Sequence, residues 1–200
     1  LSLPDALPIS ADITVVVVLY NQAHLTFRCL RSLLHQRDAS FETVIVDNAS
    51  TDRTSALLER ISGATIVRSP SNVGFLRAAN EGAFRGSAPV LLFLNNDAIP
   101  MPDALRRAAA RLRADDAIGA LGGRIVFPHG RLQEAGPIVF ANGFVIGWGM
   151  NAAPDLVRFR LPRETDFANG AFLATPRRLF AEHGGLDETF PPAYHEDTHH

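Results

Sequence analysis

Residues 13–19 read Ile-Thr-Val-Val-Val-Val-Leu, an apolar and mostly β-branched run with no polar face. Such a run is typical of a β-strand that is buried on both faces, as the strands of parallel sheets are. Two further runs, at 41–46 and 89–94, have the same character. All three are far too short to cross a membrane. The sequence therefore predicts a parallel sheet at the core of the protein.

Apolar residues at helical spacing lie between the first two strands. They fall on one side of a helix expected over 24–36, and they are Leu25, Cys29, Leu30, Leu33 and Leu34. Further helices are expected from a cap at Ser50 or Thr51 to Ile61, over 75–85 with Gly86 as a cap, over 102–113 and over 176–183. Further strands are expected over 64–68, 118–127 and 167–174. Because strands and helices alternate, we expect an α/β fold with a mostly parallel central sheet flanked by helices.

The composition is that of a globular protein, with 46% apolar and 20% charged residues among 200. It excludes a disordered chain, a collagen and a disulfide scaffold. The 19 basic and 21 acidic side chains nearly balance, so no strong positive field favours nucleic acid. Cys29 is the single cysteine and is expected in the core, which fits a reducing cytosolic setting.

Polar residues follow three of the expected strands. They are Tyr20 and Asn21 after the first, Asp47, Asn48, Ser50, Thr51 and Asp52 after the second, and Asn95, Asn96 and Asp97 after the strand at 89–94. Any one of these loops could be an ordinary polar turn. Ligands of open parallel sheets bind at the carboxyl ends of the strands, so three such loops at one edge favour a ligand site. We expect Asp52 to stabilise the start of a helix instead of contacting a ligand.

The chemistry of these residues suits a phosphorylated nucleotide ligand. The Asp47 carboxylate can accept hydrogen bonds from a base or a ribose hydroxyl. Asp97 offers one carboxylate to Mg²⁺, which typically takes one or two carboxylates together with substrate phosphates. Arg77 either faces a phosphate or is simply solvated. Near the end of the chain, Glu196 and Asp197 either provide a general base or form an exposed acidic helix start.

Taken together, these stretches resemble the family 2 glycosyltransferases, particularly the branch with rhamnosyltransferases of cell-wall and O-antigen assembly. The matching pieces are VVVVLYN (15–21), TVIVDNASTD (43–52), NVGFLRAANEG (72–82), VLLFLNNDAIP (90–100), NGAFLATPRRLFAEHGGLDETF (169–190) and HED (195–197). Each piece is weakly specific, but the set in this order is highly specific. The resemblance implies the GT-A fold, with a nucleotide-sugar-binding α/β half over 13–127 and an acceptor-binding half over 128–200. We expect 1–12 to be a leader outside the fold and the C-terminal half to be incomplete.

The resemblance also implies roles for individual residues. Asp47 would contact the uracil or thymine and the ribose, and Tyr20, Asn21 and Asn48 would line the same pocket. Arg77, Asn80, Asn95 and Asn96 would lie near the nucleotide and diphosphate. Asp97 would hold Mg²⁺ or Mn²⁺ as the last residue of the family's D-x-D motif, whose first position is Asn95 here. Asn169 and Gly170 would lie beside the donor sugar. Asp197 would be the general base, with Glu196 shaping the acceptor site.

The function implied by the resemblance is inverting transfer of a sugar from a UDP- or dTDP-linked donor to a hydroxyl of a glycan or lipid-linked acceptor. The setting would be cell-surface polysaccharide synthesis in bacteria, in the cytoplasm, with association to the inner face of the membrane left open. A catalytically inactive nucleotide-sugar-binding domain or fragment is the alternative. A nucleotidylyltransferase is disfavoured because residues 20–23, Tyr-Asn-Gln-Ala, lack the Gly-rich, basic phosphate loop that such enzymes need.

Overall fold

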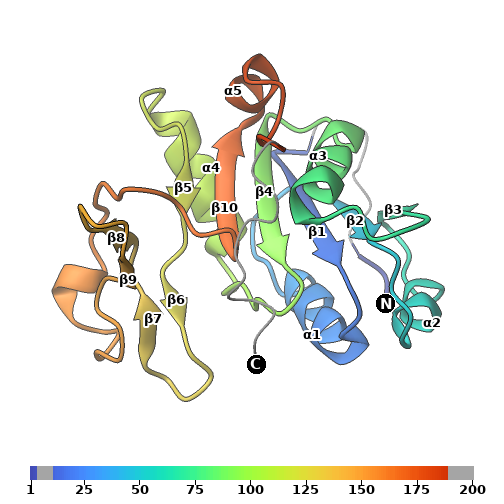
Figure 1. The fold of residues 1–200 in the computed structure, drawn as a ribbon, viewed down its shortest axis with the longest axis horizontal. Helices are drawn as coiled ribbons and strands as arrows, with labels where there is room; N and C mark the ends of the chain where they lie inside the picture. The colour runs from blue at the N-terminus through green and yellow to red at the C-terminus, as the bar shows by residue number, and fades with distance from the viewer. Residues whose placement is uncertain (4–10, 189–200) are drawn as a thin grey trace.

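The computed structural model describes residues 1–3 and 11–188, and Figure 1 shows their arrangement. The first half of the chain alternates strand and helix: β1 (Ile13–Leu19), α1 (Ala23–Leu33), β2 (Phe41–Asp47), α2 (Thr54–Leu58), β3 (Thr65–Arg68), α3 (Phe75–Arg85), β4 (Val90–Asn95) and α4 (Ala104–Ala114). The second half contains β5 (Leu121–Gly122), β6 (Ile125–Val126), β7 (Leu132–Glu134), β8 (Pro137–Val139), β9 (Val145–Gly147), a 3-10 turn (Val157–Phe159), β10 (Phe172–Pro176) and α5 (Arg177–Glu182).

A six-stranded sheet forms the centre of the molecule, with the strand order β3-β2-β1-β4-β10-β5. β1 pairs in parallel with β2 on one side and with β4 on the other, and β2 pairs in parallel with β3. β10 runs antiparallel to β4, and β5 runs antiparallel to β10. The expected α/β fold with a mostly parallel sheet is confirmed.

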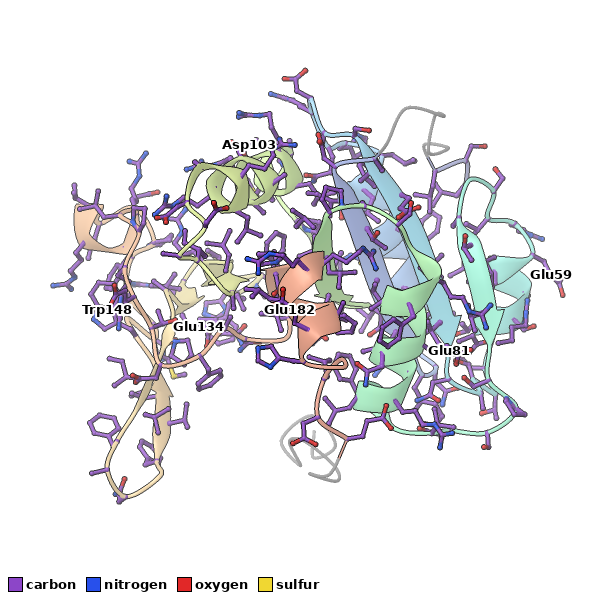
Figure 2. The ribbon with its side chains drawn as sticks, turned by 90° about the horizontal axis from the view of Figure 1, so that it is seen from above. Glu59, Glu81, Asp103, Glu134, Trp148 and Glu182 are labelled. Atoms are coloured by element: carbon purple, nitrogen blue, oxygen red, sulfur yellow. The ribbon has the colours of Figure 1, made fainter. Side chains whose placement is uncertain are left out.

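Helices cover both faces of this sheet, which explains why residues 13–19 have no polar face. Ile13, Val15 and Val17 pack with residues of α1 and α4, whereas Val16 packs with residues of α3 and α5. Successive residues of a strand point to opposite faces, so both faces of β1 must be apolar. Figure 2 shows α4, marked by Asp103, on one side of the sheet, and α5 and α3, marked by Glu182 and Glu81, on the other.

Helix α3 lies close to the sheet because small residues face it. A Cβ added at Gly82 would lie 2.6 Å from Cγ1 of Val16. Gly86 also serves close packing, because a Cβ there would lie 2.5 Å from Oγ1 of Thr14. Gly86 is the C-cap residue of α3, as expected, and its backbone is extended, with φ −93° and ψ 170°.

The second half of the chain departs most from the sequence expectations. The strand expected over 118–127 is split, because β5 joins the central sheet while β6 pairs with β7 in a separate two-stranded sheet. The N–H of Gly123, at the break, donates to the carbonyl of Phe172 at 3.2 Å. The strand expected from residue 167 begins only at Phe172. Strands β8 and β9 form a third small sheet, and Figure 1 shows β6 to β9 together at one side of the central sheet.

Leu3, within the stretch expected to be a leader, packs against the body of the protein. Leu3 is 3% exposed, and its N–H donates to the carbonyl of Ser62 at 2.9 Å. Helix α2 ends at Leu58, short of the expected Ile61. Among the described residues, no helix has the length and apolar content needed to span a membrane.

Polar side chains at the amino end of the sheet tie β10 and α5 to the first half of the chain. Glu42 accepts hydrogen bonds from Oγ1 of Thr14 at 2.6 Å and from the N–H of Ala88 at 3.0 Å. The guanidinium of Arg177, the first residue of α5, donates to Oγ1 of Thr14 and to the carbonyl of Ala83, both at 2.7 Å. This hydrogen-bond network lies at the amino ends of the strands, opposite to the carboxyl ends that carry the polar loops.

We expect the stability of the protein to depend on the charge of Glu42. Burial alone would raise the pKa of Glu42, but hydrogen bonds from Thr14, Ser87 and Ala88 and the positive charge of Arg177 together lower it. A carboxyl group with a lowered pKa stabilises the fold above its ordinary pKa, and this contribution is lost as the pH falls through the lowered value. Glu42→Gln should therefore reduce the free energy of unfolding at pH 7 and flatten its decline below about pH 4.3.

Urea denaturation at a series of pH values measures both effects. Glu59→Gln is the matched control, because Glu59 is exposed on the surface. Two results would contradict a stabilising role of the Glu42 charge. One is an equal loss of unfolding free energy in both variants, and the other is a pH dependence of stability in Glu42→Gln like that of wild type.

Candidate active site

The strand order places the candidate site at the carboxyl ends of β1, β2 and β4. The chain passes from β1 to β2 on one side and reaches β4 on the other side of β1, so the order of the strands reverses beside β1. Leu19 lies opposite Asp47, and Val18 lies opposite Asn95. Open α/β sheets bind their ligands at such a point. The predicted polar loops are therefore brought together at one edge.

Asn21 ties the loop after β1 to the loop after β2. Its N–H donates to Oγ of Ser50 at 2.8 Å, and its Oδ1 accepts from the N–H groups of Thr51 at 2.8 Å and Asp52 at 3.2 Å. Asn21 has a left-handed backbone, with φ 60°, which asparagine tolerates better than most residues. Tyr20, beside it, is 51% exposed, so its side chain is available to a ligand.

Asp52 joins the starts of two helices, in agreement with the role expected from the sequence. Its Oδ1 accepts from the N–H of Thr54 at 2.9 Å, and its Oδ2 accepts from the N–H of Ala23 at 3.1 Å. Burial alone would raise the pKa of Asp52, but these hydrogen bonds and those from the Thr54 hydroxyl and the Gln22 N–H lower it. The expectation that Ser50 or Thr51 caps α2 is wrong, because the N-cap residue is Arg53 and both Ser50 and Thr51 hydrogen-bond with Asn21 instead.

Asp47 and Asn48 are buried where β2 ends. Asp47 is 4% exposed, its Oδ1 accepts from the N–H of Ser50 at 2.9 Å, and its Oδ2 lies 3.8 Å from Nη1 of Arg68. The amide of Asn48 donates to Oδ1 of Asn72 at 2.8 Å and accepts from the N–H of Val73 at 2.9 Å. Asn48 thus holds the loop before α3, and a direct ligand contact by its side chain stays a prediction.

Three polar residues, Asn95, Asn96 and Asp97, lie where β4 ends, and the middle one is held by a hydrogen bond. Nδ2 of Asn96 donates to Oγ1 of Thr26 at 3.1 Å. Within the described part of the chain, the side chains of Asn95 and Asp97 have no hydrogen-bond or ion-pair partner, and Asp97 is exposed. Because Asn95 and Asp97 have no protein partner in this part of the chain, their oxygen atoms are available as ligands of a divalent cation.

Asn169 and Gly170 lie beside this loop because β10 runs antiparallel to β4. The N–H of Asn95 donates to the carbonyl of Ala171 at 3.3 Å, and Oδ1 of Asn169 accepts from the N–H of Ala171 at 2.8 Å. A Cβ added at Gly170 would meet no atom within 4 Å, so the space around it is open. The segment that the resemblance assigns to the donor sugar thus adjoins the loop of Asp97.

Arg77 and Asn80 lie on α3, one helical turn apart, but their side chains differ in availability. Arg77 is exposed and has no partner among the described residues. The amide of Asn80 donates to the carbonyl of Leu186 at 2.9 Å and to Oε1 of Glu188 at 2.8 Å, and it accepts from the N–H of Leu186 at 2.7 Å. Asn80 therefore anchors the segment after α5, and contact with a ligand would require these bonds to break.

A hollow lies apart from the strand-end loops. It has a volume of about 460 Å³ and is lined by Asn80 and by residues 183–188, and neither Asp47 nor Asp97 lines it. The predicted catalytic residues Glu196 and Asp197 lie outside the described residues, so their roles stay predictions.

Burial distinguishes two further titratable groups. Cys29 is fully buried in the core, as expected, and burial together with the nearby Asp97 raises its pKa to about 12. It is therefore not a reactive thiol. Glu134 on β7 is 7% exposed, and burial raises its pKa, opposed in part by the nearby side chain of Asn169. No pattern in the sequence around Glu134 marks it as buried, and we did not predict it as a site residue.

Comparison with known proteins identifies the family. A family model described as glycosyl transferase family 2 matches residues 14–184. The chain belongs to this family. The O-antigen biosynthesis protein RfbC of Myxococcus xanthus is 30% identical over 188 residues, which are 89% of this chain and 15% of that protein. The succinoglycan biosynthesis protein ExoO of Rhizobium meliloti is 34% identical over 119 residues, or 58% of this chain and 33% of that protein.

Solved glycosyltransferase structures share the fold. The mannosyltransferase PcManGT of Pyrobaculum calidifontis, solved in complex with GDP-Man and Mn²⁺, superposes with a TM-score of 0.66 at 24% identity, covering 92% of this chain and 49% of that one. The S. aureus protein TarS, residues 1–349 in complex with UDP, has a TM-score of 0.50 at 25% identity, covering 56% and 34%. The GT-A fold implied by the resemblance is confirmed. The chain spans about half or less of each of these relatives.

We expect Asp52→Ala to destabilise the glycosyltransferase domain by about 1 kcal/mol, the usual cost of losing a helix cap. The effect should be larger than that of Asp103→Ala, because Asp103 makes only exposed ion pairs within α4. Chemical denaturation at pH 7 measures both. Equal stability of Asp52→Ala and wild type would contradict the linking role of Asp52.

Proposed function

We propose that this domain is an inverting glycosyltransferase. It would move a sugar from a UDP- or dTDP-linked donor to a hydroxyl of a glycan or lipid-linked acceptor in the synthesis of a cell-surface polysaccharide. The observation that carries the proposal is the meeting of Tyr20, Asp47, Asn95 and Asp97 at the carboxyl edge of the sheet, where the strand order reverses around β1. Biosynthesis of O-antigen and succinoglycan by relatives supports the class of product.

The residues of the β4 loop fit a divalent cation that is shared with a diphosphate. No group of three His, Cys, Asp or Glu side chains able to hold a metal occurs among the described residues. Asp97, with the amide oxygen of Asn95, would therefore hold Mg²⁺ or Mn²⁺ together with phosphate oxygens, an arrangement usual for Mg²⁺. When bound, the cation neutralises the charge that develops on the departing diphosphate.

The other residues would bind and orient the reactants. The buried carboxylate of Asp47 would accept hydrogen bonds from the base and the ribose, while Tyr20 would cover the nucleotide. Arg77, exposed and without a partner in the described part, would approach the phosphates. Asp197 would take the proton of the acceptor hydroxyl as that hydroxyl attacks the anomeric carbon, with Glu196 beside it.

A panel of nucleotide sugars tests the proposed function. UDP-, dTDP- and GDP-linked sugars would be tested for thermal stabilisation with and without Mn²⁺, followed by an assay for donor hydrolysis or transfer. A ligand at about one hundred times its dissociation constant should stabilise the fold by about 2.7 kcal/mol. Binding without hydrolysis or transfer would favour the inactive binding domain, and stabilisation by no nucleotide would contradict the proposal.

Asp97→Ala should abolish the part of UDP affinity that depends on Mn²⁺, because it removes the one carboxylate of the β4 loop. Calorimetric titration with UDP, with and without Mn²⁺, measures this dependence. Asp116→Ala is the control, because Asp116 is an exposed carboxylate in the loop after α4. An unchanged response to Mn²⁺ in Asp97→Ala would refute the metal role.

Asp197→Asn should lower the rate of transfer about 10²-fold or more, the scale of general-base catalysis, and leave UDP affinity unchanged. Asp155→Asn, a change of an exposed acid, should leave both intact. Near-full transfer by Asp197→Asn in a defined assay would show that another group accepts the proton.

A further inference from the structure

Glu134 is a buried acid for which the proposed mechanism has no use. Asp47 and Glu134 are the buried carboxylates of the described residues. Asp47 has Arg68 within 3.8 Å, whereas no cation forms an ion pair with Glu134 in the described part of the chain. Burying a carboxylate without a compensating cation is unfavourable, because the charged form loses its hydration. An acid held in this way is more readily explained by a ligand than by the stability of the fold.

Asn169 connects Glu134 to the loop that carries Asp97. The side chain of Asn169 lies near the carboxylate and, as a hydrogen-bond donor, lowers its pKa, although burial raises it more. Oδ1 of Asn169 accepts from the N–H of Ala171 at 2.8 Å, and the carbonyl of Ala171 accepts from the N–H of Asn95 at 3.3 Å. Glu134 therefore adjoins the Asn169–Gly170 turn from the side of the small β-sheets, and Figure 2 labels it between Trp148 and the helices of the central sheet.

The surroundings of Glu134 leave part of its hydrogen-bonding capacity unused. Ile125 lies opposite it on β6, and β9 packs so closely that a Cβ added at Gly147 would lie 2.8 Å from the Cβ of Glu134. An ionised carboxylate can accept about four hydrogen bonds, and the side chain of Asn169 is the one donor found near it among the described residues. Among the described side chains, the oxygens that are wholly buried and unpaired are Thr43 Oγ1 and Ser69 Oγ. Any unpaired Glu134 oxygen is therefore accessible from solvent.

A neutral ligand that donates several hydrogen bonds suits this carboxylate. Sugar hydroxyls have this chemistry, and hydrogen bonds to a charged acceptor are about twice as strong as neutral ones. The adjoining turn is the segment to which the proposed function assigns the donor sugar. We propose that Glu134 is a sugar-binding residue of this site, which accepts a hydrogen bond from a hydroxyl of the donor hexose; this inference rests on the proposed function.

Glu134→Gln separates a binding role from a structural one. Glutamine keeps the size of the side chain and an oxygen for Asn169, but it lacks the charge that strengthens a bond to a hydroxyl. Since burial disfavours the carboxylate in the folded state, the variant should unfold at the same temperature as wild type or higher at pH 7. A residue that only supported the fold would instead lose stability when replaced.

Calorimetry with matched pairs of probes tests the inference: UDP against UDP-glucose and UDP-GlcNAc, dTDP against dTDP-rhamnose, and GDP against GDP-mannose. For the pair that wild type binds, Glu134→Gln should keep the affinity for the free nucleotide within about twofold. It should weaken binding of the nucleotide sugar about tenfold or more, the scale of a hydrogen bond to a charged group. Glu164→Gln, a change of an exposed acid in the same half, is the control and should change neither affinity.

Three results would overturn the inference. Equal affinities of Glu134→Gln and wild type for the nucleotide sugar would show that Glu134 does not bind the donor. A fall in kcat with an unchanged KM for the donor would instead indicate proton transfer, and a change in acceptor KM alone would place Glu134 at the acceptor. In each case unchanged nucleotide binding would leave the proposed function standing. Failure of wild type to bind any probe would overturn the proposed function and this inference with it.

Discussion

The pairing of β1 with two parallel neighbours is the constraint on which the rest of the structure depends. β1 is in register with β2 over its whole length and with β4 over all but its last residue, so the three strands end within about one residue of each other. Both faces of β1 are covered by helices, which bury the apolar residues of the strand on both sides of the sheet. This pairing alone brings the loops that carry Asn21, Asp47 and Asp97 together. The contacts between the loops are not needed to explain why they meet.

The two ends of the sheet use polar groups differently. At the amino end, Glu42, Thr14 and Arg177 satisfy one another and the nearby backbone, and they hold β10 in place. At the carboxyl end, Asn21 and Asp52 shape the loops, while the side chains of Asn95 and Asp97 have no hydrogen-bond or ion-pair partner among residues 1–3 and 11–188. A site for a charged ligand needs side chains whose hydrogen-bonding capacity is not already used within the protein.

The sequence predicted the first half of the fold well, because its signals are local. Runs such as 13–19 and the helical spacing around Cys29 depend on neighbouring residues alone, and the polar loops follow from where the strands end. The second half depends on contacts distant in sequence. The antiparallel direction of β10 and the break in the strand at Gly123 both arise from tertiary neighbours. For the same reason the sequence did not mark Glu134 as buried or reveal that Asn80 anchors the segment around Leu186.

The most direct test of the central claim is the paramagnetic broadening of backbone amide resonances when UDP and Mn²⁺ are added to the isotopically labelled chain. If the strand ends form the site, the resonances of residues 20–21, 47–48, 95–97 and 169–171 should broaden first, while those of Glu42 and Ser87 at the opposite edge stay sharp. Broadening centred on Glu42 and Ser87, or on the hollow beside Leu186, would contradict the account.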